Sequence, residues 1–221
     1  MKKIKFIFAV HNHQPVGNFE WVFQKGYDNA YKPFMDVMLK HKSIKWNLHA
    51  SGILWDFLLS KKSYVSNIKK LIAKGNLEIL SGGYYEPILS VIPQKDRIGQ
   101  INKLSQFIKN TFNCNPAGAW IAERVWEPSL VKDLTDAGIK YVALDDVHFS
   151  SSGLDVNSLR GYYTTEDHGA PLNVFPISQK LRYFIPFHDV NVCIDYFKRM
   201  AQEDKETVLV MADDGEKFGM W

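Results

Sequence analysis

The sequence is poor in cysteine and carries little excess charge of either sign. Cys114 and Cys193 are its 2 cysteines, far apart and without metal-ligand spacing, so we expect free thiols and no disulfide framework. The 27 Lys and Arg are interspersed with the 24 Asp and Glu, which gives a net charge of +3. Because the chain has no basic stripe to follow a phosphate backbone, we expect no nucleic-acid partner.

Long apolar runs are also missing. No segment approaches the ~20 consecutive apolar residues that span a bilayer. The first apolar stretch, residues 4–10, is interrupted by Lys5 and runs into His11 without the small residues of a leader-peptide cleavage site. We therefore expect a soluble, cytoplasmic protein with no membrane partner. The sequence leaves the oligomeric state open.

The chain does have a regular alternation of strand-like and helix-like segments. Its 46% hydrophobic and 23% charged residues suffice to bury one sizeable core. Strands are expected at residues 4–10, 44–50, 77–80, 117–122, 141–144, 172–175 and 207–212. Helices are expected at residues 27–39, 53–59, 64–73, 97–111, 130–137 and 190–202. This alternation predicts a parallel sheet, and the number of strands favours a TIM-like α/β barrel over a three-layer sandwich.

Two regions depart from a complete, regular barrel. Residues 149–170, with several glycines and tyrosines, are expected to form an insertion near the barrel mouth. The chain ends at Trp221, directly after an expected strand end and short of the ~250 residues usual for a whole barrel. We therefore expect residues 1–221 to form one barrel domain, a fragment incomplete at its C-terminus that lacks further helical and accessory regions.

Polar motifs follow three of the expected strands. His11 and His13 come after the first strand, Glu123 after the strand at 117–122, and Asp214 at the end of the last strand. In a parallel barrel the C-terminal ends of the strands meet at one mouth, so we expect these side chains there. Two carboxylates beside aromatic walls suit glycosidic-bond chemistry, in which one attacks or activates water and the other protonates the leaving oxygen. Cleavage or transfer of sugar bonds is the leading hypothesis.

Each carboxylate also has a simpler interpretation. Glu123 could be a surface acid paired with Arg124, although the flanking Trp120 and Trp126 argue against this. In a catalytic Glu123, the same arginine would help to keep the carboxylate ionised. Asp214 could be a turn residue, since Asp and Gly favour turns for local reasons. The indoles could be core residues or stacking surfaces for sugar rings.

The histidine pair admits a metal-binding interpretation. His11 and His13 lie two residues apart at a strand end, so both rings can face one side and either donate to sugar hydroxyls or bind a metal. Metal-dependent amidohydrolases also begin with a His-x-His pair after a first barrel strand. They need further ligands from later strands, for which His49, His148 and Asp145 are available without a distinguishing spacing. Ordinary histidines in a polar loop are the third interpretation.

Two further acids lie in unusual surroundings. Glu78 places a charge inside an apolar strand, and Glu86 follows the glycine- and tyrosine-rich residues 81–85. A buried carboxylate without a partner is costly, so each is expected to have a role.

Four segments together closely resemble glycoside hydrolase family 57, in its α-amylase and 4-α-glucanotransferase group. They are residues 11–19 (HNHQPVGNF), 82–87 (GGYYEP), 120–128 (WIAERVWEP) and 213–219 (DDGEKFG), in the order usual for that family. The resemblance spans essentially the whole chain. It implies a (β/α)7 barrel related to the TIM fold and a retaining mechanism on α-1,4-glucans such as starch or glycogen. No cofactor and no metal is expected.

The resemblance also implies roles for individual residues. In similar proteins the residue matching Glu123 is the nucleophile, and the one matching Asp214 is the general acid/base. Residues that would line the sugar subsites are His11, His13, Glu78, Trp120, Glu216 and Trp221. The family's fifth segment, from a helical region beyond the barrel strands, has no counterpart in residues 1–221. A glucan-binding fragment without turnover and a metal-dependent barrel hydrolase stay open as alternatives.

Overall fold

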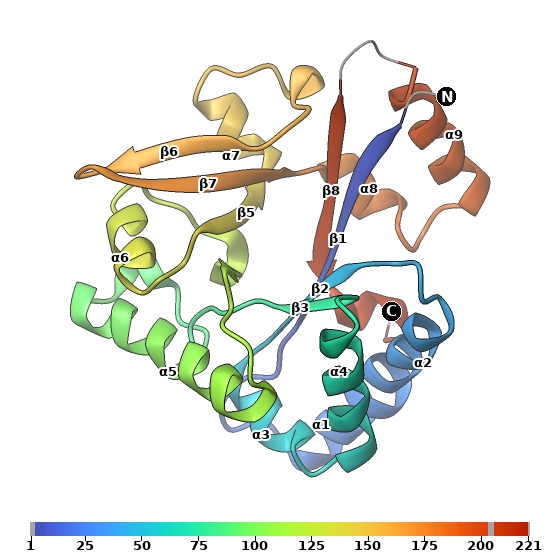
Figure 1. The fold of residues 1–221 in the computed structure, drawn as a ribbon, viewed down its shortest axis with the longest axis vertical. Helices are drawn as coiled ribbons and strands as arrows, with labels where there is room; N and C mark the ends of the chain where they lie inside the picture. The colour runs from blue at the N-terminus through green and yellow to red at the C-terminus, as the bar shows by residue number, and fades with distance from the viewer. Residues whose placement is uncertain (1–2, 203–205, 221) are drawn as a thin grey trace.

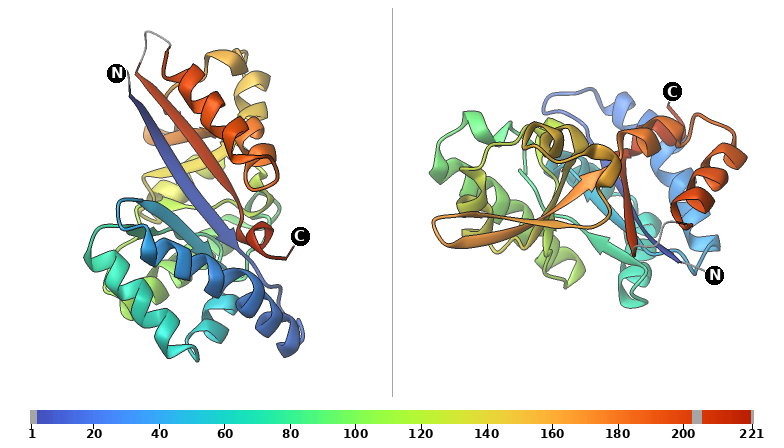
Figure 2. Two further views of the ribbon diagram at one scale, coloured as in Figure 1. Left: turned by 90° about the vertical axis from the view of Figure 1, so that its right-hand side faces the viewer. Right: turned by 90° about the horizontal axis from the view of Figure 1, so that it is seen from above.

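The computed structural model describes residues 3–202 and 206–220, and its central feature is a parallel sheet (Figure 1). The parallel strands are β1 (Ile4–Asn12), β2 (Trp46–Ala50), β3 (Leu77–Ile79), β4 (Gly118–Ala119), β5 (Tyr141–Asp145), β7 (Ala170–Ile177) and β8 (Thr207–Asp214). Their order in the sheet is β3-β2-β1-β8-β7-β5-β4. The long strands β1 and β8 therefore lie side by side although they come from opposite ends of the chain (Figure 2).

The two ends of this strand order meet. Just past β3, Ser81 forms a parallel bridge with Ala119 of β4. The amide of Ser81 donates to the carbonyl of Gly118 at 2.9 Å, and the amide of Trp120 donates to the carbonyl of Ser81 at 2.8 Å. Within the described residues, seven parallel strands thus form a ring. The predicted TIM-like (β/α)7 barrel is confirmed.

Helices connect the strands and lie outside the ring (Figure 1). They are α1 (Glu20–Gly26), α2 (Lys32–Lys40), α3 (Gly52–Leu58), α4 (Lys62–Ala73), α5 (Gln94–Phe112), α6 (Leu130–Asp136), α7 (Asp146–Ser151), α8 (Gln179–Phe184) and α9 (Val190–Met200). In α4 the buried residues Tyr64, Ile68 and Leu71 recur at three- and four-residue spacing, as a helix packed on a sheet requires. Among the described residues, no helix combines the length and the apolarity needed to cross a bilayer.

Apolar side chains pack on both sides of the strands. Outside the ring, one cluster packs α1 to α4 against β1 to β3 around the fully buried Trp55. A second cluster packs α5 and α6 against β5 and β7. Inside the ring, small residues such as Ala9 and Ala212 surround Trp120 and line an apolar cavity of about 300 Å³. The small side chains leave room inside the barrel for the polar groups at its mouth.

The N-terminal helical region is longer than the sequence predicts. The helix expected at residues 27–39 is preceded without a break by α1, and a π-helical segment, η1 (Tyr27–Tyr31), joins α1 to α2. Helix α1 buries Phe23 and Gly26 and leaves Trp21 exposed, so its apolar pattern is weak. Helix α8 was missed for a similar reason, since its one buried residue is Leu181.

The prediction that residues 149–170 form an insertion near the barrel mouth is wrong in part. Residues Tyr163–Asp167 form strand β6, which pairs antiparallel with β7 from Tyr163 opposite Val174 to Asp167 opposite Ala170. This hairpin lies at the start of β7 and not at the mouth of the barrel, where β7 ends. The residues of β6 alternate between intermediate and exposed positions, so the strand lacks the apolar alternation by which it could be recognised.

Both cysteines are free, as the sequence predicts. Cys193 is buried in α9 and Cys114 is half-buried after α5. Burial raises the pKa of both thiols, so both stay protonated at neutral pH.

Candidate active site

Polar side chains from several strand ends meet at one end of the barrel. His11 of β1 lies level with Asp214 of the neighbouring β8. Glu86, in the loop after β3, bonds both His11 and His13. The charge of Glu123, which follows β4, raises the pKa of the ring of His13, so it also lies nearby. The C-terminal ends of the strands thus bring these side chains to the mouth.

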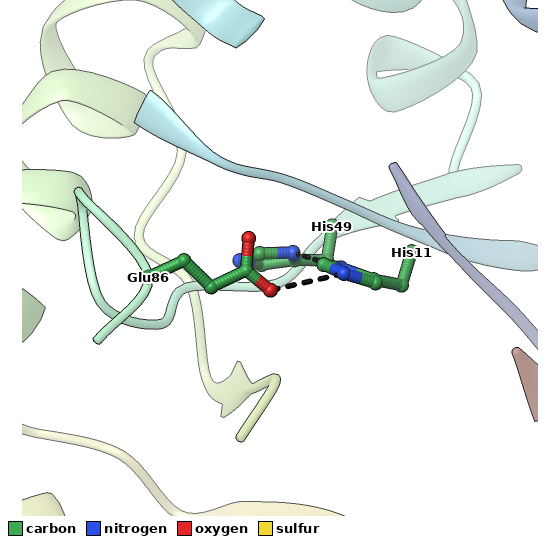
Figure 3. A group of neighbouring side chains, drawn as sticks. All are labelled: His11, His49 and Glu86. Atoms are coloured by element: carbon green, nitrogen blue, oxygen red, sulfur yellow. Dashed lines mark hydrogen bonds and ion pairs between the residues drawn. The ribbon is translucent and has the colours of Figure 1, made fainter. Parts of the chain in front are cut away.

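Glu86 ties the histidines of the mouth together. Its Oε1 lies 2.9 Å from His11 Nε2, and its Oε2 is bonded to His13 Nδ1. On the far edge of the His11 ring, Nδ1 lies 2.7 Å from Nδ1 of His49, which comes from β2 (Figure 3). The side chains of Glu86 and His11 are 6% and 8% exposed, against 37% for His13. His13 is therefore the most open of the three.

The protonation of this cluster follows from its charges. Burial alone would raise the pKa of Glu86, but the adjoining His11 and His13, both hydrogen-bonded to it, hold it well below its ordinary value. Burial of the His13 ring lowers its pKa, yet the hydrogen bond to Glu86 and the nearby carboxylates leave it raised. Burial, with the neighbouring His11, lowers the pKa of His49 to about 3. Glu86 is thus a carboxylate and His49 a neutral ring at pH 7.

Trp120 supports this cluster. Its indole stacks on the ring of His11, with centroids 4.5 Å apart and planes 9° from parallel. The guanidinium carbon of Arg124 lies 5.6 Å from the centre of the same indole. Trp120 is 2% exposed and offers little open surface to a sugar ring. The other flanking indole, Trp126, packs against the apolar cluster around α5 and α6.

Glu216 is anchored from two other elements. It lies in η5 (Gly215–Phe218), directly after β8, and its Oε1 accepts the backbone N–H of His13 at 3.0 Å. The same oxygen accepts the hydroxyl of Tyr31, which itself accepts from Gln14 Nε2 at 3.0 Å. Burial raises the pKa of Glu216 in spite of these bonds. Glu216 therefore holds a proton more readily than an ordinary glutamate.

The backbone is strained where the acids are presented. Glu86, Glu123 and Arg124 have φ values of 56°, 51° and 56°, in the left-handed region that non-glycine residues rarely adopt. Such conformations persist where the surroundings fix them, and they occur often at active sites. The turn at Glu123 is held in part by His148, whose Nε2 donates to the carbonyl of Arg124 at 3.0 Å. The Glu123 side chain is exposed at the mouth.

A row of alternating charges runs between the segments that follow β4 and β8. Arg124 Nε donates to Asp145 at 2.9 Å, and Arg182 donates to the other oxygen of Asp145 at 3.0 Å. Arg182 also donates to Asp213 at 3.1 Å, and Lys217 bonds the remaining oxygen of Asp213. Burial would raise the pKa of Asp213, but the two cations keep it below its ordinary value.

This row fixes the neighbours of both candidate catalytic acids. Arg124 directly follows Glu123, and Asp213 directly precedes Asp214, so the two peptide segments are linked through charged side chains. The sequence interpretation paired Arg124 with Glu123. In the structure the observed partner of Arg124 is Asp145, so its guanidinium balances that carboxylate.

One predicted subsite residue, Glu78, lies below the mouth. Glu78 lies level with Asn47, two residues before His49 along β2, and so one layer deeper in the barrel. Its carboxylate accepts the hydroxyl of Tyr141 at 2.8 Å and the amide of Asn47 at 3.2 Å. Trp221 lies outside the described residues.

Several residues of the mouth were not assigned roles from the sequence. Tyr31 sits in a helix at ordinary spacing, and nothing in the sequence distinguishes it from a core tyrosine. Arg182 lies in α8, which was not predicted. Asp145 did carry a signal, because it ends an expected strand as Glu123 does, but it was considered only as a metal ligand. His49 was recognisable as an inward residue of an expected strand, without an indication of its partner.

Comparison with known proteins identifies similar chains. The sequence profile described as "Glycosyl hydrolase family 57" matches residues 7–221. "Alpha-amylase 1" of Dictyoglomus thermophilum is 48% identical over 221 residues, which cover 100% of this chain and 32% of that protein. "4-alpha-glucanotransferase" of Thermococcus litoralis is 46% identical over 222 residues, covering 100% of this chain and 34% of that protein.

A solved structure agrees with these matches. The crystal structure of the 4-alpha-glucanotransferase from Thermococcus litoralis superposes with a TM-score of 0.96 at 45% identity, and covers 100% of this chain and 35% of that one. The chain thus spans about a third of the length of the relatives that it matches.

Proposed function

Because the chain belongs to glycosyl hydrolase family 57, we propose that it carries the catalytic barrel of an enzyme that cleaves or transfers α-1,4-linked glucans. The relatives described above are named alpha-amylase and 4-alpha-glucanotransferase, and α-glucans are the substrates that both names imply. The observation that carries the proposal is the position of Glu123 and Asp214. They follow different strands at one mouth, on segments linked by the charged row from Arg124 to Asp213.

In the first step Asp214 is protonated and acts as the general acid. It donates its proton to the glycosidic oxygen while Glu123 attacks the anomeric carbon. The bond from that carbon to the leaving oxygen breaks, and a covalent glycosyl ester forms on Glu123. The exposed position of Glu123 suits a nucleophile, because its carboxylate is accessible at the mouth where a sugar must enter.

In the second step Asp214 acts as a base. It takes a proton from water or from the 4-hydroxyl of another glucan, and the resulting oxygen nucleophile displaces Glu123 from the anomeric carbon. Water as acceptor gives hydrolysis, and a glucan gives transfer. Two displacements at one carbon retain the anomeric configuration, for which the carboxyl groups of Glu123 and Asp214 should lie ~5 to 5.5 Å apart.

The sugar in the cleaved position would be held by His13 and Glu216, with His11 packed beside His13 as support. His13 is the most open ring of the cluster and has a raised pKa, so it can donate to a sugar hydroxyl. His11, backed by Trp120, lies beside it with ring centroids 6.0 Å apart. Glu216 is a further acceptor at the same edge. Glu78 is not part of this arrangement, because its hydrogen-bond partners, Tyr141 and Asn47, lie one layer deeper in the barrel.

Product analysis tests the proposal. Maltooligosaccharides of defined length are incubated with residues 1–221 and with a polypeptide that continues past Trp221, and Glu123→Ala serves as the blank. Products longer than the substrate establish transfer, and shorter products alone establish hydrolysis. An α-configured first product, observed by NMR, establishes retention, whereas a β-configured product would sink the covalent mechanism. Glucan binding without any product from either polypeptide would favour a binding fragment.

A further inference from the structure

His49 is a buried histidine to which the two-carboxylate reaction assigns no task. It is 0% exposed, and its Nε2 has no hydrogen-bond partner among the described residues. A Cβ added to Gly82 would lie 2.8 Å from that nitrogen, so a glycine is what gives the ring its room. Its other nitrogen lies 2.7 Å from His11 Nδ1. Burying an imidazole with one unpartnered nitrogen is costly, and the cost suggests that the remaining bond has a use.

The arrangement favours a hydrogen-bonded chain over a metal site. Ligand atoms of His11, His49 and Glu86 lie within 4.8 Å of one another, close enough to consider a metal ion. However, His11 turns Nδ1 to His49 and Nε2 to Glu86, which are two different edges of one ring (Figure 3). The three groups therefore form a hydrogen-bonded row, in the sense that His11 bonds both of the others. A metal needs lone pairs that converge on one point.

The row has one consistent proton assignment in which every ring is neutral. Glu86 is ionised and only accepts, so His11 Nε2 carries the proton of that hydrogen bond. A neutral His11 then has a lone pair at Nδ1 and accepts from the Nδ1–H of His49. His49 keeps its lone pair at Nε2, which faces Gly82. Glu123, His13, Asp214, Glu216 and Tyr31 are other titratable groups of this mouth, and none is a hydrogen-bond partner of His49.

We propose that His49 is a positioning residue, whose Nδ1–H bonds the Nδ1 lone pair of His11 and so fixes the plane of that ring with its Nε2–H directed at Glu86. His11 in this orientation donates to Glu86 Oε1 and leaves Oε2 to accept from His13, so one buried ring orients both His11 and His13. This role rests on the proposed glucan-active function. Without the donor at His49, the Nδ1 lone pair of His11 has no partner, so the ring is free to turn and its hydrogen bond to Glu86 weakens.

A matched pair of substitutions tests the role. His49→Leu removes the donor, whereas His49→Asn places an amide N–H the same number of bonds from Cβ as imidazole Nδ1. We expect kcat/KM on maltooligosaccharides to fall about tenfold in His49→Leu, on the scale of one hydrogen bond, and to be largely kept in His49→Asn. His41→Leu, at the exposed end of α2, controls for the loss of a histidine as such.

The second readout is the hydrogen bonding of His11, observed by ¹⁵N NMR of its ring nitrogens. We expect a proton on Nε2 in all three chains. The bare Nδ1 accepts a hydrogen bond in the parent chain and in His49→Asn, and its ¹⁵N resonance should move to the position of an unbonded lone pair in His49→Leu. A structural role alone would lower thermal stability in both variants and leave this pattern unchanged, which would overturn the proposal. So would stoichiometric Zn²⁺ binding that requires His49. If the NMR pattern holds but no chain turns over glucan, the proposed function fails while the assignment of His49 and His11 stands.

Discussion

Arg182 donates to the buried carboxylate of Asp213 at 3.1 Å, and this contact joins the last strand of the barrel to the chain that leads away from β7. The guanidinium of Arg182 also reaches Asp145 at the end of β5. Asp145 in turn holds Arg124, the neighbour of Glu123. A catalytic pair must be held within about half an ångström of its working geometry. Side chains that cross-link four strand ends can do this where short, strained turns alone would not.

The first prediction concerns Asp213. Asp213→Asn removes a carboxylate that is 0% exposed and leaves Arg182 and Lys217 without their shared anion. Breaking a buried ion pair from one side typically costs ~3 kcal/mol, so we expect a clearly lower free energy of unfolding and reduced activity. Denaturant unfolding monitored by circular dichroism measures the former.

The pH dependence of stability gives a sharper test of Asp213. The pKa of Asp213 is lower in the folded chain than in the unfolded one. Its contribution to the free energy of unfolding is therefore complete at pH values above the ordinary aspartate pKa, and it is lost as the pH falls through the pKa of the folded chain. The gap in unfolding free energy between the parent and Asp213→Asn should therefore narrow towards acid pH. A gap that stays constant from neutral to strongly acid pH would contradict the ion-pair account.

The second prediction concerns Glu123. Glu123→Ala should lower turnover by at least ~10³-fold, because the nucleophile cannot be replaced by binding contacts, while glucan binding measured by calorimetry persists. Glu127→Ala is the matched control, an exposed acid four residues further along the same segment, and should keep its activity. An active Glu123→Ala variant would remove the assignment of the nucleophile.

The sequence predicts the barrel well because its physical signals are local. Residues 207–212 are apolar and become β8, and residues 64–73 show helical spacing and fall within α4. Strand β6 and helix α8 were missed because they bury little, so packing and not periodicity determines them. The free cysteines followed from their spacing, and the family resemblance from four motifs.

The site was less predictable, because its contacts join residues far apart in the chain. The sequence places Trp120 beside Glu123 and suggests a sugar-stacking surface, whereas in the fold its ring lies against His11. It places Arg124 beside Glu123, whereas the left-handed turn directs the guanidinium to Asp145. Both outcomes depend on backbone angles that residue types alone do not specify.

The third prediction concerns Tyr31, whose hydroxyl donates to Glu216. Tyr31→Phe removes a hydrogen bond that favours the carboxylate form, so the pKa of Glu216, already raised by burial, should rise further. If activity requires ionised Glu216, the acid limb of the kcat/KM profile should move to higher pH. Tyr27→Phe, which removes a hydroxyl from the same π-helical segment, should leave that limb in place. If the parent chain, Tyr31→Phe and Tyr27→Phe all gave the same profile of kcat/KM against pH, Glu216 would not be the group that sets the acid limb.

The fourth prediction is that chelation leaves turnover unchanged. In the competing interpretation His11, His49 and Glu86 bind a catalytic metal, since their ligand atoms lie within 4.8 Å of one another. Each of the two hydrogen bonds in the row uses one lone pair and one proton, and a metal would have to break both. Dialysis against EDTA followed by a maltooligosaccharide assay should therefore give the kcat of the untreated chain. A loss restored by Zn²⁺, with His49→Leu unable to recover, would instead establish a metal-dependent hydrolase and displace Glu123 as the nucleophile.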